Sequence, residues 1–164
     1  MPIPAAPRGH GPAAAILALF HQLHQQLRDE LTGLDDDAIN WLPALGANSI
    51  ATIVTHLIGS EAETLRSVAG TECERDRDAE FVARRLAMDE VIGLVRAADS
   101  LVADLGPLMD SKRLDATFPL PTLPAEETRP GLTWLIGNYG HAREHVGQVQ
   151  LTKQLWQQAR QSPS

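Results

Sequence analysis

Apolar residues recur at spacings of three and four along four stretches of the chain, which is the pattern of amphipathic helices. We expect four helices, over residues 13–32, 50–69, 80–105 and 131–156. Gly33 and the pair Gly106-Pro107 end the first and third of these stretches, while Asn48 or Ser49 can cap the second. Four helices of this length predict an all-α, single-domain four-helix bundle.

The segments between these helices are polar or rich in proline. Residues 34–46 form a connector in which Trp41 stands beside Pro43, and we expect this indole to cover one end of the bundle. Residues 110–130 contain four prolines and little periodicity, which predicts a long irregular crossover before the last helix. The chain therefore divides into a flexible N-terminal arm (1–12), the bundle (13–156) and a polar C-terminal tail (157–164).

Composition narrows the range of functions. A net charge of −7 with no basic run argues against a nucleic-acid partner. The longest apolar run, residues 13–20, is too short to span a membrane and leads into His21 without a cleavage pattern, so we expect neither a membrane segment nor a signal peptide. Cys73 is the only cysteine, which favours a cytoplasmic location.

Three histidines are candidate metal ligands. His141 and His145 lie one turn apart on the last helix, on a face that overlaps its apolar arc, and Gln148 follows one turn later. His56 borders the apolar arc of the second helix and completes a set of three imidazoles. Three protein ligands leave a coordination position open, as in catalytic metal sites. His24 lies within the apolar stripe of the first helix, where a hydrogen-bonded core histidine is expected.

Two other chemically active residues allow a structural or a functional interpretation. Glu61 falls inside the apolar arc of the second helix, so its carboxylate needs a partner. That partner can be an Arg, a His or a hydrogen-bonding network, and Glu61 is either a structural carboxylate paired with an Arg or Tyr or a group that acts beside the metal. Cys73 lies in a charged turn with no neighbouring histidine, so we do not expect it to be a nucleophile, although Arg75 and Arg77 stand close by.

The motifs in register resemble those of the DinB-like (DinB/YfiT) superfamily of small metal-binding four-helix bundles. They cover residues 13–156 and comprise Trp41-Leu42-Pro43, Asn48-Ser49-Ile50, the HLIGSE stretch from His56 to Glu61, and HAREHVGQ from His141 to Gln148. The resemblance implies that His56, His141 and His145 bind a divalent metal, with zinc and nickel the first expectations. The chain departs from the family pattern at Glu144, where a further His is frequent, and at Val146, where Arg is frequent.

The resemblance also implies a class of activity. Characterised members are mostly thiol-dependent S-transferases and isomerases, so we expect a small electrophilic substrate and a low-molecular-weight thiol as cosubstrate. Glu61, Glu144 and Gln148 are the candidates for orienting an imidazole or moving a proton near the metal.

The sequence is also compatible with two alternative functions. The HAREH stretch fits the H-x-x-E-H motif of a metal-dependent hydrolase, but no acidic residue follows His145 to complete its ligand set. A non-catalytic metal-binding or dimerisation module is the other alternative, and a homodimer through helix faces is compatible with either role.

Overall fold

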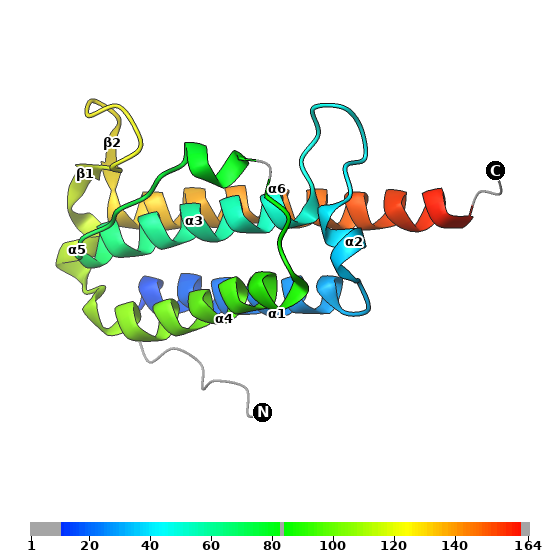
Figure 1. Ribbon diagram of the computed structural model, residues 1–164. Helices are drawn as coiled ribbons and strands as arrows, with labels where there is room; N and C mark the ends of the chain where they lie inside the picture. Colours follow the sequence, from blue (N-terminus) through cyan, green and yellow to red (C-terminus); the bar gives the residue numbers. More distant parts are fainter. Residues whose placement is uncertain (1–10, 83, 162–164) are drawn as a thin grey trace.

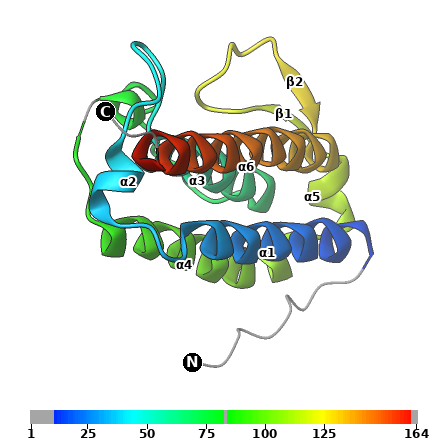
Figure 2. The same cartoon turned by 90° about the vertical axis from the view of Figure 1, so that its right-hand side faces the viewer.

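Four long helices form the protein, in a computed structural model that describes residues 11–82 and 84–161 (Figure 1). They are α1 (Pro12–Leu31), α3 (Ile50–Ala69), α4 (Met88–Leu105) and α6 (Gly131–Gln161). α3 and α6 lie side by side in one layer, and α1 and α4 in the other (Figures 1 and 2). The predicted all-α four-helix bundle is confirmed. Among the described helices, none has the length and hydropathy needed to cross a membrane.

Short elements occupy the connections. The connector after α1 contains α2 (Asp36–Asn40), and the 3₁₀ turns η1 (Asp78–Phe81) and η2 (Gly106–Leu108) flank α4. The crossover holds a helical turn, α5 (Ser111–Asp115), and an antiparallel pair of strands, β1 (Thr117–Pro119) and β2 (Thr128–Pro130). The indole Nε1 of Trp134 donates to the Phe118 carbonyl at 2.8 Å and so ties this hairpin to α6.

Helix ends agree with local capping chemistry. α3 has the expected bounds: the Ser49 hydroxyl accepts a hydrogen bond from the Thr52 amide, and Gly70 ends the helix at a φ of 73°. α6 continues past Trp156 to Gln161, because the glutamines, alanine and arginine of this segment favour a helix.

The Trp41 ring lies 5.6 Å from that of Trp156. Of the predicted N-terminal arm, residues 1–10 lie outside the described residues, and Pro12 already belongs to α1.

The expected helical start at residue 80 is wrong, since α4 begins only at Met88. The side-chain amide of Asn40 donates to the Leu86 carbonyl and its oxygen accepts from the Leu86 amide, which holds this segment extended. Glu90 then accepts from the Ala87 amide at the start of the helix. The segment before α4 is therefore free to fold against α3.

Two apolar clusters, one toward each end of the bundle, form its core, and polar side chains lie between them. Glu61 on α3 and Asp99 on α4 each fall between the residues of the two clusters on their own helix, and His24 on α1 lies close to this boundary, next to Leu23. Asn138 and His141 occupy the corresponding stretch of α6. The buried ionisable side chains thus lie near the middle of the helices.

Candidate metal centre

The three predicted histidines come together between α3 and α6. His56 projects from α3, and His141 and His145 project from α6, with ring centroids 4.3 to 5.3 Å apart. One ring nitrogen from each lies within 4.8 Å of the others, and the Nε2 atoms of His56 and His141 are 3.3 Å apart. This cluster is compatible with metal binding, because imidazole nitrogens at this spacing can share one ion.

Hydrogen bonds at Nδ1 of His56 and of His145 leave the Nε2 atom of each ring available to bind a metal. His56 Nδ1 lies 2.8 Å from Glu80 Oε2, and His145 Nδ1 lies 2.9 Å from Gln148 Oε1, so each Nδ1–H donates outward. The lone pair of each Nε2 then points to the centre. His145 Nε2 is buried and has no hydrogen-bond partner among the described residues. A divalent metal fits these residues, since it would satisfy a buried nitrogen that otherwise has nothing to accept from.

Glu80 is held by an ion-pair network. Arg75 donates from Nε and Nη2 to the Glu80 carboxylate at 2.7 and 2.8 Å, and from Nη1 to Glu63 Oε2 at 2.7 Å. Gly59 lets the carboxylate approach α3: a Cβ at this position would lie 2.1 Å from Glu80 Oε1. The Phe81 ring lies 4.7 Å from the ring of His56. The η1 segment thus fixes the orientation of the His56 imidazole.

The imidazoles of His56 and His141 are held neutral. Burial, reinforced by the neighbouring His145 and His56, lowers the pKa of His141 to about 4. Burial also lowers the pKa of His56, and the Glu80 carboxylate opposes this only in part. Neutral rings have a lone pair to donate, so near neutral pH these two histidines are ready to act as ligands.

The other predicted site residues separate into two places. Gln148 is exposed and pairs with His145 as expected of a group that orients an imidazole. Glu144 is exposed on the same helix, and its charge acts on His141. Glu61 is fully buried, and both of its carboxylate oxygens lie 2.9 Å from His24 Nε2. In the described part of the chain no hydrogen bond or ion pair joins Glu61 to the three histidines.

His24 and Glu61 belong to a separate buried network. His24 Nδ1 lies 2.8 Å from Asp99 Oδ1, and the same oxygen lies near His21 Nδ1. The other carboxylate oxygen of Asp99, Oδ2, accepts a hydrogen bond from Arg28. Burial disfavours the charged ring, but the hydrogen bonds and charges of Asp99 and Glu61 outweigh it and raise the pKa of His24 to about 9. The prediction of a hydrogen-bonded core histidine is confirmed. Of the partners that the sequence allows for Glu61, the structure shows a histidine, His24.

Sequence patterns did not reveal Glu80, Arg75 or Glu63 as parts of the site. Glu80 falls where the apolar pattern predicts the start of a helix, but α4 begins only at Met88. Glu63 is a buried carboxylate on α3, and the sequence does not indicate its partner, Arg75. Burial raises the pKa of the Cys73 thiol, in agreement with the expectation that it is not a nucleophile.

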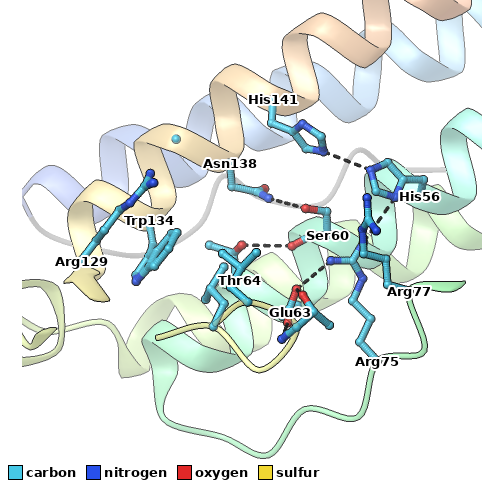
Figure 3. A pocket seen from close by; sticks show the side chains of 14 residues that line it. His56, Ser60, Glu63, Thr64, Arg75, Arg77, Arg129, Trp134, Asn138 and His141 are labelled. Atoms are coloured by element: carbon cyan, nitrogen blue, oxygen red, sulfur yellow. Dashed lines mark hydrogen bonds and ion pairs between the residues drawn. The ribbon is translucent and has the colours of Figure 1, made fainter. Parts of the chain in front are cut away.

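A cavity of about 340 Å³ adjoins the histidines (Figure 3). It begins at His56 and His141, passes Ser60 and Asn138, and reaches Trp134 and the β-hairpin. A ligand in this cavity would have direct access to the histidine cluster from one side. The arrangement combines a three-histidine cluster with an adjoining space of small-molecule size.

Fold and site together define a helical bundle with a three-histidine cluster at the interface of two antiparallel helices. The DinB superfamily sequence profile matches residues 3–149, and the chain belongs to this superfamily. The fold is similar to that of a DinB-like protein from Bacillus cereus, with a TM-score of 0.67 and 15% sequence identity over 91% of this chain and 94% of that one. No curated protein matches the sequence.

Proposed function

We propose that this protein is a divalent-metal enzyme of the thiol-dependent S-transferase or isomerase type, acting on a small electrophile. His56, His141 and His145 are the ligands, with zinc or nickel as the metal and a low-molecular-weight thiol as cosubstrate. The observation that carries the proposal is the buried Nε2 of His145, which has no partner of its own while its Nδ1 is paired with Gln148. Membership of the DinB superfamily supports the class of activity.

The protein's own groups prepare the site for a cosubstrate. Glu80 and Gln148 orient the rings of His56 and His145, so little rearrangement is needed when ligands bind. Three protein ligands leave a position for an exogenous group, and the cavity beside His56 and His141 leads to it. When bound, a divalent metal lowers the pKa of a coordinated thiol and presents it as a nucleophile.

The first experiment is elemental analysis of untagged protein. Parent protein is compared with the triple variant carrying His56→Ala, His141→Ala and His145→Ala, and with His21→Gln as a matched control outside the cluster. The proposal expects near-stoichiometric metal in the parent and in the control, and loss of metal in the triple variant. Metal content that is unchanged in the triple variant would refute the assigned ligands.

Activity is tested next. Metal-loaded parent protein is mixed with a set of low-molecular-weight thiols and a chromogenic electrophile such as 1-chloro-2,4-dinitrobenzene, and formation of the thioether is followed. The proposal expects a rate above the uncatalysed reaction that disappears in the triple variant. A protein that binds metal but neither binds a thiol nor accelerates its reaction would instead be a non-catalytic metal-binding module.

A further inference from the structure

The cavity beside the histidine cluster is basic, although the protein as a whole carries a net charge of −7. Three arginines and one carboxylate line it: Arg75, Arg77, Arg129 and Glu63. Figure 3 shows Arg129 beside Trp134 at one end, while Arg75 and Arg77 lie at the other end near His56. A cluster of guanidinium groups in an acidic protein attracts anions to this one place.

The three arginines differ in whether their guanidinium groups are already paired with carboxylates of the protein. Arg75 forms ion pairs with two carboxylates, those of Glu63 and Glu80, which neutralise its charge and occupy its hydrogen-bond donors. Arg129 lies over the Trp134 ring at 4.7 Å, and its nearest carboxylate, on Glu127, is 3.8 Å away. Arg77 is exposed and lies over the Phe81 ring, and within the described residues it has no carboxylate partner.

A second observation also points to a ligand. Asn138 lines the same cavity and is only 8% exposed. Its Nδ2 donates to the Ser60 hydroxyl at 3.0 Å, whereas its Oδ1 is buried and accepts no hydrogen bond from the described residues. A buried amide oxygen without a partner destabilises the protein, and a hydrogen-bond donor on a bound molecule would remove this cost.

We propose that this cavity is a subsite for a small organic anion, whose carboxylate is bound by one of the two arginines at its ends, Arg77 near the histidines or Arg129 beside Trp134. Trp134 supplies an apolar wall for the carbon chain, and Asn138 accepts a hydrogen bond from an N–H or O–H of the same molecule. The inference deepens the proposed function, on which it rests: the anion lies next to the metal, so the molecule that reaches the open coordination position bears a carboxylate. Guanidinium groups bind carboxylates through paired, charge-assisted hydrogen bonds.

The test uses pairs of thiols that differ only in charge. Cobalt-loaded protein is titrated with 3-mercaptopropionate against 3-mercapto-1-propanol, and with 6-mercaptohexanoate against 6-mercapto-1-hexanol, following the thiolate-to-cobalt absorption band. The two chain lengths cover different reaches from the metal to the arginines. In at least one pair the acid binds about tenfold more tightly than the alcohol, as expected for one charge-assisted contact. The double variant Arg77→Gln, Arg129→Gln removes this preference and leaves the affinity for the alcohols unchanged.

A second arm tests the subsite without the metal. Metal-free protein is titrated with hexanoate or 1-hexanol while the indole N–H resonance of Trp134 is followed, its signal being assigned by Trp134→Phe. Hexanoate shifts the resonance at lower concentration than hexanol, and the double variant abolishes the difference. Arg85→Gln is the matched control, because Arg85 is an exposed arginine that pairs with Asp37 and does not line the cavity.

The two arms separate failure of the inference from failure of the proposed function. Absence of a thiolate band with every thiol, together with a hexanoate preference that needs the two arginines, would refute the thiol-dependent function and support the anion subsite. Equal affinity for acids and alcohols in both arms would overturn the inference while leaving the metal site intact. A carboxylate preference that persists in the double variant would also overturn it.

Discussion

Adding a single methyl group at Gly59 should weaken metal binding without destabilising the fold. Its place on α3 faces the carboxylate that pairs with His56, and a Cβ there would lie 2.1 Å from Glu80 Oε1 and 2.9 Å from Glu80 Cδ. Ordinary contact begins near 3.4 Å, so the carboxylate must move by about 1.3 Å, the difference between 3.4 and 2.1 Å. A displacement of this size breaks the 2.8 Å hydrogen bond to His56 Nδ1.

The Gly59→Ala variant is therefore expected to fold and to bind metal weakly. The clashing atoms belong to the end of a flexible side chain, which can withdraw, and alanine is favoured over glycine in a helix by about 1 kcal/mol. Loss of an outer hydrogen bond to a ligating histidine typically raises the metal Kd by about 10- to 100-fold, or roughly 1.4–2.7 kcal/mol. We expect Glu80→Gln to lower the affinity in the same range.

The assay is a competition titration of zinc between the protein and a chromophoric chelator, with thermal unfolding measured in parallel. Gly93→Ala is the matched control, since Gly93 is an exposed helical glycine on α4 with no atom within 4 Å of the added Cβ. The control should keep the parent Kd. A Gly59→Ala protein with the parent Kd and an intact fold would refute the role given to Glu80 in orienting His56.

Two further predictions concern the buried network and the exposed side of the site. Because the pKa of His24 rises from 6.5 to about 9 on folding, its contribution is fully present below pH 6.5 and is lost as the pH rises through 9. Chemical denaturation should show the free energy of unfolding falling by roughly 3 kcal/mol over this range, and a flat profile, or the same profile in His24→Gln, would contradict the assignment. Gln148→Ala should raise the zinc Kd by no more than about tenfold, because the hydrogen bond between Gln148 and His145 is exposed to water. This effect should be smaller than that of Glu80→Gln, and an equal or larger effect in the same chelator titration would contradict the prediction.

The sequence was sufficient to predict what depends on residues close together in the chain. The spacing of apolar residues predicted all four long helices, although α4 begins at Met88 and not at residue 80. The start of α3 after Ser49 was predictable because a cap acts within one turn. The i, i+4 spacing of His141 and His145 placed both on one face of α6, and His56 joined them because α3 packs against α6. The bundle and the three-histidine cluster were accessible from local patterns together with the family resemblance.

Only the tertiary structure decided which partner each buried charge would have. Glu61 had to find a partner because it lies on an apolar face, but the choice of His24 depends on how α1 packs beside α3, 37 residues away in sequence. Glu80 reaches His56 because Asn40 holds the segment before α4 extended and Gly59 leaves space for the carboxylate. Periodicity reports which face of a helix is buried. It does not report what lies opposite, because that depends on contacts between segments distant in sequence.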